Sequence, residues 1–190
     1  MLRAVGGGDV MTPNARRVCA KLYTAQAAGV ADDVFVPLFH EWIQQRSFPG
    51  VLLDVADYTH VPDGPGVILV GYGTMFALDR ADGRFGLLAQ RRRPDSDTSS
   101  AIVSVVRELL EVAARLEADR RLAGVLVFDR YVLRIEVNDR LHAPNTDASF
   151  EELAPLAQRA IAEVFGGSVL GIERVENDPR DRLGLLARLA

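Results

Sequence analysis

Four short apolar segments follow one another between residues 50 and 90, and only a few residues separate each from the next. They read GVLLDVADY, GVILVGY, TMFAL and RFGLLAQ. The connection between the last two, DRADG, contains Asp82-Gly83, a pair typical of tight hairpin turns. Strands joined by so few residues must run antiparallel, because a parallel pair needs a long crossover connection. This stretch therefore predicts consecutive antiparallel strands in the middle of the chain.

Three longer segments carry apolar residues at the one-and-four spacing of helices that pack on a core. The first covers residues 32–45, the second has the longest apolar stripe, from residue 102 to 116, and the third covers residues 149–165. The expected ends are Asp32 or Asp33 as cap of the first helix, Ser99 or Ser100 as cap of the second, Ser149 with Glu152 as capping box of the third, and Gly166-Gly167 as its stop.

The remaining strand-like segments are residues 17–23, 124–128, 131–139, 168–175 and 183–189. For the last of these a short helix is the weaker alternative, because Gly184 disfavours it. Val67–Val70 is apolar at every position, which is typical of a central strand covered on both faces. This order predicts an α+β fold: a single domain with about three helices packed on one mixed, mainly antiparallel sheet. We expect the domain to cover residues 15–190, and the glycine-rich residues 1–14 to form a disordered leader.

Composition argues against several classes of function. The chain has 26 acidic against 22 basic residues, a balance that argues against a dedicated nucleic-acid binder. Its longest uncharged stretch, residues 64–78, is too short and too rich in glycine to span a bilayer, so no membrane association is expected. The single cysteine, Cys19, cannot form an internal disulfide and fits a reducing compartment, which predicts a cytoplasmic protein. Lys21 is the only lysine, so every other basic residue is arginine.

The segment HVPDGPG, residues 60–66, is the first candidate site. Tyr58 and His60 would share a face of the preceding strand, and with Asp57 and Asp63 they could form an acid–base or ligand-binding group. The alternative is a tight turn, in which prolines fix φ, glycines accept positive φ and His60 is merely exposed. The nearby glycines do not form a P-loop, because the required lysine followed by serine or threonine is absent from the sequence.

Arg91, Arg92 and Arg93, with Arg80 and Arg84 close by in the sequence, form the one dense basic patch. Their guanidinium groups could hold the phosphate or carboxylate of a small anionic ligand, or bind an acidic partner. The alternative is a solvated hairpin end that keeps a sheet edge from pairing.

Metal binding and nucleophilic catalysis have weaker signals. His40, His60 and His142 show no ligand spacing along one element, so we expect no metal site and no cofactor. Cys19 has no histidine near it in the sequence and predicts a buried, inert thiol. No serine lies in a G-x-S-x-G elbow, the main signal of a serine hydrolase.

Two hypotheses about function follow. The first is a non-enzymatic domain that binds a small anionic ligand or a protein partner and self-associates, for example as a homodimer. The second is a small hydrolase or isomerase, in which His60 acts as the acid–base group with Asp57 or Asp63 while an arginine of residues 91–93 holds an anion.

Overall fold

The computed structural model describes all residues except 1–16, 28–29, 47, 49 and 168, so the expected leader at residues 1–14 lies outside the described part. Eight strands form one sheet in the order β2-β3-β4-β5-β1-β6-β8-β7, and each neighbouring pair is antiparallel. The strands are β1 Val18–Gln26, β2 Leu52–Tyr58, β3 Gly66–Gly71, β4 Thr74–Asp79, β5 Gly86–Arg91, β6 Val127–Val137, β7 Val169–Arg174 and β8 Leu183–Leu189. The α+β prediction is confirmed, and the described strands are antiparallel throughout rather than mixed.

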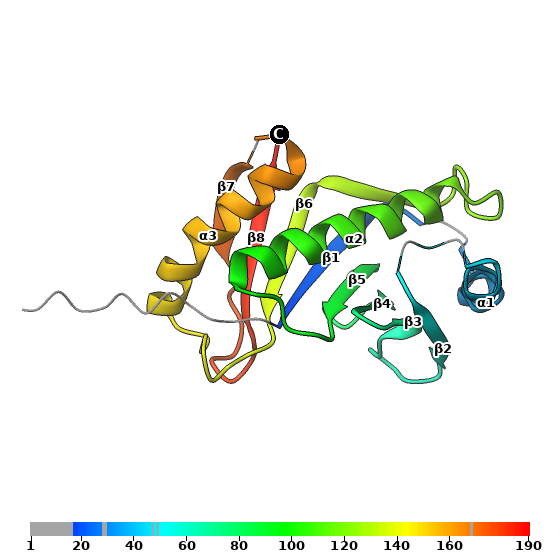
Figure 1. Ribbon diagram of the computed structural model, residues 1–190, viewed down its shortest axis with the longest axis horizontal. Helices are drawn as coiled ribbons and strands as arrows, with labels where there is room; N and C mark the ends of the chain where they lie inside the picture. The colour runs from blue at the N-terminus through cyan, green and yellow to red at the C-terminus, as the bar shows by residue number, and fades with distance from the viewer. Residues whose placement is uncertain (1–16, 28–29, 47, 49, 168) are drawn as a thin grey trace, which may run out of the picture.

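The three α-helices of the described residues pack on one face of this sheet (Figure 1). They are α1 Phe35–Gln45, preceded by the 3-10 turn η1 Asp32–Val34, α2 Thr98–Ala118 and α3 Asp147–Phe165. α1 covers β2, α2 crosses the middle of the sheet, and α3 lies over β7 and β8. One hydrophobic core fills the space between the helices and the sheet.

Strand β1 shows how the sheet separates its two faces. Side chains alternate along a strand, and Val18, Ala20 and Leu22 are fully buried in the core beneath the helices. Cys19 and Lys21 therefore lie on the opposite face, which carries no helix in the described part of the chain. We call this the uncovered face, and it holds most of the polar groups discussed below.

The predicted helix caps are wrong at all three N-termini. Neither η1 nor α1 has a side-chain cap, and Asp32 pairs instead with Arg80 across 2.9 Å. Asp97 caps α2 by accepting a hydrogen bond from the Ser100 N–H, and Thr146 caps α3 by accepting one from the Ser149 N–H. The predicted serines thus lie inside the first turn: Ser100 and Ser149 each follow the capping acceptor by three residues, and Ser99 follows Asp97 by two. The stop of α3 at Gly166, with φ of 80°, is confirmed.

Two strand predictions need correction as well. Residues 124–128 do not form a separate strand: Gly124 has φ of 78°, the N–H groups of Val125 and Leu126 bond back to Leu122, and β6 then runs unbroken to Val137. Strand β3 lies between β2 and β4 and so is not an edge strand, as predicted, but within the described residues helices cover only one of its faces. The β4–β5 hairpin and a strand at 183–189 are confirmed.

Candidate functional site

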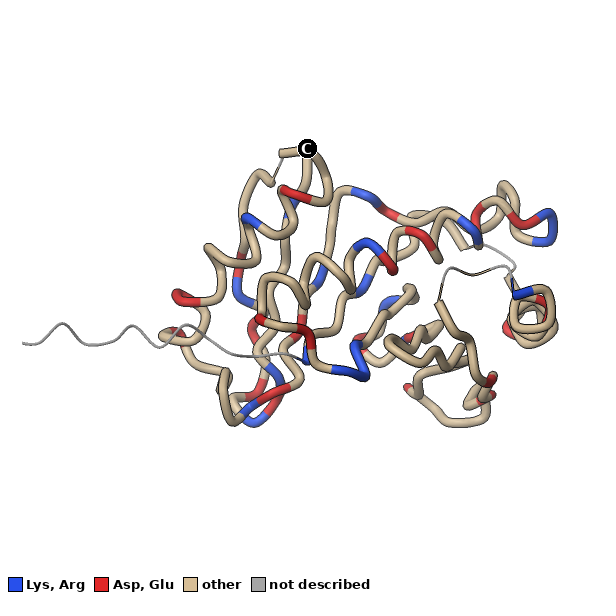
Figure 2. The backbone as a smooth tube through the Cα atoms, in the orientation of Figure 1, with Lys and Arg blue, Asp and Glu red and all other residues tan. Residues whose placement is uncertain are grey.

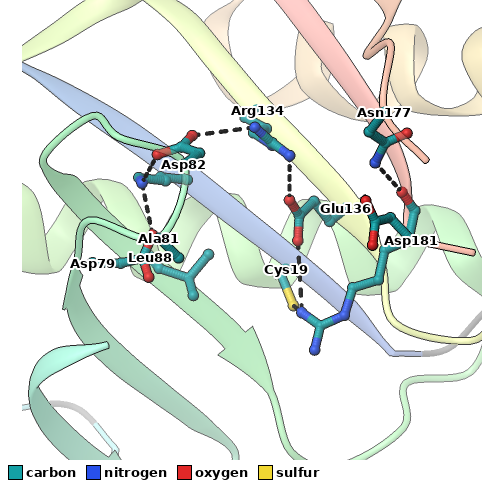
Figure 3. Close-up of a pocket in the computed structure, with 11 residues that line it drawn as sticks. Cys19, Asp79, Ala81, Asp82, Leu88, Arg134, Glu136, Asn177 and Asp181 are labelled. Atoms are coloured by element: carbon teal, nitrogen blue, oxygen red, sulfur yellow. Dashed lines mark hydrogen bonds and ion pairs between the residues drawn. The ribbon is translucent and has the colours of Figure 1, made fainter. Parts of the chain in front are cut away.

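A row of alternating charges crosses the uncovered face of the sheet (Figure 3). We call it the charged row, and its members are, in order, Asp79, Lys21, Asp82, Arg134, Glu136 and Arg182. They come from β4, β1, the β4–β5 turn, β6 and the loop before β8. The strand register explains why these side chains lie close together, because Lys21 is paired with Leu88 of β5 on one side and with Arg134 of β6 on the other.

Lys21 is the most enclosed member of the charged row, with only 3% of its surface exposed. Its Nζ donates to Asp79 at 2.6 Å, to Asp82 at 2.5 Å and to the carbonyl oxygen of Arg84 at 2.8 Å. An ammonium group has three donors, so all of them are used inside the fold. The only lysine of the chain is therefore a structural cation, with no donor left for a ligand.

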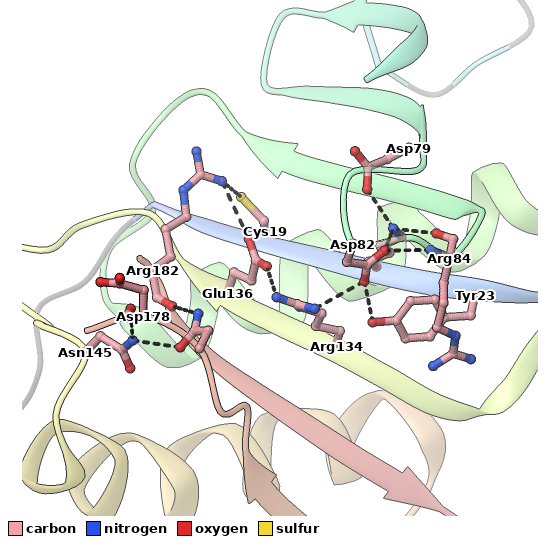
Figure 4. A network of polar contacts seen from close by, with 12 residues as sticks. Cys19, Tyr23, Asp79, Asp82, Arg84, Arg134, Glu136, Asn145, Asp178 and Arg182 are labelled. Atoms are coloured by element: carbon pink, nitrogen blue, oxygen red, sulfur yellow. Dashed lines mark hydrogen bonds and ion pairs between the residues drawn. The ribbon is translucent and has the colours of Figure 1, made fainter. Parts of the chain in front are cut away.

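Asp82 joins the two cations in the middle of the row. It accepts hydrogen bonds from Lys21, from the Tyr23 hydroxyl at 2.8 Å and from Arg134 at 3.1 Å (Figure 4). Burial alone would raise the pKa of Asp82, but the hydrogen bonds from Lys21 and Tyr23 outweigh it and lower the pKa. Burial raises the pKa of Tyr23, so its hydroxyl stays protonated and keeps donating.

The row ends in a weakly held guanidinium. Arg134 is tied to Glu136 at 2.7 Å, whereas Arg182 lies 3.6 Å from Glu136 and its side chain is 42% exposed. The same Arg182 group approaches the sulfur of Cys19 at 3.9 Å. The Nε of Arg134 also has no hydrogen-bond partner, but it is buried. Of the cations in the charged row, Arg182 is thus the one whose donors are open to a ligand.

Cys19, whose sulfur the Arg182 guanidinium approaches, is fully buried (Figure 4). Burial raises the pKa of its thiol to about 12, and the nearby Arg182 only partly offsets this. A thiol with so high a pKa carries almost no thiolate at neutral pH, and the thiolate is the nucleophile. This fits the expected inert thiol.

An open depression of about 320 Å³ lies over the charged row. Its rim includes Asn177 and Asp181 of the loop between β7 and β8. Asn145 holds that loop by donating to the Asn177 side chain at 2.7 Å and to the carbonyl of Asp178 at 3.0 Å (Figure 4). Asn177 in turn donates to the carbonyl oxygen of Arg182 at 3.0 Å. These bonds fix the backbone that carries Arg182, while its side chain stays exposed.

The first predicted group lies on the β2–β3 hairpin, at the edge of the sheet. The rings of Tyr58 and His60 are stacked with centroids 6.4 Å apart. Asp57 accepts bonds from the N–H and hydroxyl of Thr59, and these bonds lower its pKa. Asp63 adopts a φ of 53° in a turn that the Gly64 N–H closes on the Val61 carbonyl. The structure brings Asp57, Tyr58 and His60 together on an exposed turn.

The structure does not bring the arginine patch to His60. Tyr58 pairs with Gly66 at one end of β3, whereas Arg91 pairs with Thr74 beyond the other end, roughly 17 Å away for a strand of this length. Arg91 is held by Asp95 and Glu108, Arg92 by the carbonyl of Gly71, and Arg93 lies over the Tyr72 ring. Nearer the hairpin, Arg80 pairs with Asp32, and Arg84 lies over the ring of Tyr23.

The sequence contained a signal for the charged row that the prediction did not use. In YVLRIEVND the residues Arg134 and Glu136 alternate with apolar ones, which marks the polar face of β6. The lone Lys21 inside an apolar strand is a second signal. His142 pairs with Asp139 across 3.0 Å, and the described residues contain no group of three or more His, Cys, Asp or Glu that could hold a metal ion.

Comparisons of the chain with protein-family models, with curated proteins and with solved structures gave no match. Within the described residues, each helix is too short or too polar to cross a membrane.

Proposed function

We propose that this protein is a binding protein without catalytic activity, and that it holds a small ligand by a carboxylate group in the depression over the charged row. The observation that carries the proposal is the open end of the row at Arg182, where a guanidinium lies 3.6 Å from its nearest carboxylate and faces the depression. A guanidinium binds a carboxylate through two parallel hydrogen bonds, which gives direction as well as strength.

A contribution to the stability of the fold does not by itself explain why the chain has this charged row. Burying paired charges costs desolvation energy, and apolar side chains of similar volume often stabilise a fold as well or better. Lys21 and its partners Asp79 and Asp82 nevertheless occupy the middle of the sheet. Charged groups held in place beside a depression are typical of binding sites. Their arrangement supports a role in fixing Arg134 and Arg182 for a ligand.

The charge balance favours a particular kind of ligand. Three cations, Lys21, Arg134 and Arg182, line the depression together with four carboxylates, those of Asp79, Asp82, Glu136 and Asp181. The lining therefore carries one excess negative charge. Such a site disfavours a polyphosphate but suits a molecule with one carboxylate and an amine, because Asp181 can accept the amine. An amino acid or a similar zwitterion has this chemistry.

The expectations about compartment, self-association, nucleic-acid binding and enzymatic activity stay proposals. The single buried cysteine is free and supports a reducing compartment, which favours the cytoplasm. Self-association as a homodimer and the absence of nucleic-acid binding rest on composition and on general frequency. The hydrolase or isomerase alternative needs an arginine beside His60, and those of residues 91–93 lie at the other end of β3.

Native mass spectrometry of the gently purified protein tests the proposal. We expect a mass excess that disappears on denaturation, or, for protein that has lost its ligand, a thermal shift with one or more amino acids at millimolar concentration. A ligand at ten times its Kd stabilises the fold by about 1.4 kcal/mol, which raises Tm by roughly 3–6 °C in a protein of this size.

Two arginines of one loop provide the matched variants. Arg182→Ala should abolish the mass excess or the thermal shift, whereas Arg180→Ala should keep it, because Arg180 pairs with Asp178 outside the depression. A clean subunit mass together with no thermal shift from any amino acid would overturn the proposal. So would equal effects of the two variants.

A further inference from the structure

Strand β2 forms one edge of the sheet, and its outer side has no neighbouring strand in the described part of the chain. An edge strand presents unpaired backbone N–H and C=O groups to which another extended chain can add. Large apolar side chains also lie along this edge: Val51 is 63% exposed, Leu53 49% and Tyr58 42%. Backbone groups and apolar side chains are thus available at the same place.

The charge of this edge is one-sided. Between residues 50 and 66, which cover β2 and the turn to β3, the chain has three aspartates, Asp54, Asp57 and Asp63, and no lysine or arginine. Figure 2 shows acidic positions without basic ones on the β2–β3 hairpin. Asp54 and Asp57 of β2 are exposed, and neither has an ion pair with a described lysine or arginine.

The opposite edge of the sheet differs. On β7, Glu173 pairs with Arg188 at 3.2 Å, and Arg174 pairs with Asp147 and with the side chain of Asn145. Its charges are thus balanced within the chain. This contrast makes β2 the edge that has charges left for a partner.

We infer that the β2 edge binds an extended segment of a partner protein that carries two basic residues three positions apart. Asp54 lies opposite Val70 and Asp57 opposite Val67, so the two carboxylates point to opposite faces of the sheet. A strand added beside β2 would meet one carboxylate on each face. Basic residues at spacing three project to opposite faces in the same way.

A local bond at Asp54 would be exchanged when a strand adds. The Val55 N–H now donates to the carboxylate of Asp54 at 2.8 Å. An incoming carbonyl group could accept from this N–H instead, which frees the carboxylate for a cation. The addition therefore loses no backbone hydrogen bond and gains an ion pair.

A second copy of the chain fits this edge less well. Two β2 strands pairing with each other would bring four carboxylates, Asp54 and Asp57 of each copy, onto neighbouring strands. Like charges that face each other across a strand pair are destabilising. A basic segment from another protein has the complementary charge.

Fluorescence anisotropy with a labelled peptide, TVRVTRVT, tests this inference on the full chain. We expect saturable binding that weakens at least tenfold with Asp54→Asn plus Asp57→Asn, since asparagine keeps the local bonds but removes the charge. Glu173→Gln on the opposite edge is the matched control and should leave the affinity unchanged. The peptide TVEVTEVT, and a version of the first peptide methylated at its central backbone nitrogens, should not bind.

Several outcomes would overturn the inference. One is no saturable binding of the arginine peptide; another is equal binding by the aspartate double variant or by the methylated peptide. A concentration-dependent dimer that the double variant strengthens, seen by analytical ultracentrifugation, would assign the edge to a second copy instead. None of these readouts involves Arg182, so the proposed ligand site stands or falls separately.

Discussion

The charged row and the β2–β3 hairpin both hold aspartates beside an aromatic ring, but the surroundings of the charges differ. In the row, Asp82 is bonded to Lys21, Tyr23 and Arg134, and the cations are largely buried. On the hairpin, Asp57 is exposed and bonds only within its own turn, to Thr59. Enclosed, paired charges hold one geometry, whereas exposed charges without ion pairs are free to meet a partner. The first region therefore suits a fixed site for a small ligand, and the second suits an edge that accepts a chain.

The largest expected loss of stability tests whether the charges of the charged row are buried and paired. Lys21→Met leaves the buried Asp79 without its cation and Asp82 with Arg134 alone, and breaking a buried pair costs about 3–5 kcal/mol. Urea denaturation measures this change in the free energy of unfolding. The double variant Lys21→Met with Asp79→Leu should regain part of the loss. A loss below about 1 kcal/mol in the single variant would contradict the enclosed row.

The pH dependence of stability tests whether the thiol of Cys19 is buried. Burial raises the pKa of Cys19 from 9.0 to about 12 in the folded state. The unfolded chain then loses this proton first as the pH rises, so stability falls between about pH 9 and pH 12, by roughly 4 kcal/mol in all. The contribution is fully present below pH 9.

Cys19→Ala is the control for that pH series, since it removes the titrating group and keeps a small apolar side chain. The fall in stability between pH 9 and pH 12 should become shallower in this variant. Equal slopes in the wild type and the variant would place the thiol in water. A fast reaction of the native thiol with a disulfide reagent at pH 8 would lead to the same conclusion.

Much of the fold could be predicted because its signals are local. Short connections set the antiparallel order of β2 to β5, and apolar spacing set the three helices. The cap of α2 was missed because all six residues of the segment DSDTSS carry a side-chain acceptor, and local sequence does not select Asp97 among them. The charged row could not be assembled from the sequence, because Lys21 and Arg182 are 161 positions apart and reach the same face of the sheet only through the β1–β6–β8 register.

At the β2–β3 hairpin the error was the opposite one, because a site was predicted there from residues that are close in the sequence. His60, Asp57 and Asp63 drew attention because they are close in the sequence, but local closeness mostly reflects a turn. Gly66, at the end of that turn, is the residue with the strictest requirement. It has φ of 62°, and an added Cβ would lie 2.3 Å from the carbonyl oxygen of Leu78.

An intermediate effect is expected when that glycine is replaced. Gly66→Ala should destabilise the fold by roughly 2–3 kcal/mol, from backbone strain and the clash with Leu78. Gly83→Ala, at a similar φ of 75° but with open space around it, is the matched control and should cost less. Thermal unfolding separates the two. Equal losses would mean that the close contact with Leu78 contributes nothing.

The smallest effect is expected at His60. His60→Ala changes an exposed side chain, so stability should stay within about 0.5 kcal/mol of the wild type. The thermal shift caused by an amino acid should also be unchanged. A variant that keeps its Tm but loses the ligand response would move the binding site from the charged row to the hairpin.

An NMR titration locates the bound ligand, which we expect over the charged row. Amide shifts would be followed while the amino acid with the largest thermal effect is added to ¹⁵N-labelled protein. We predict that the shifted amides cluster in β1, in β6 and in the loop carrying Asn177 and Arg182. Shifts confined to the β2–β3 hairpin around His60, with none in that loop, would place the ligand on the hairpin and not over the charged row.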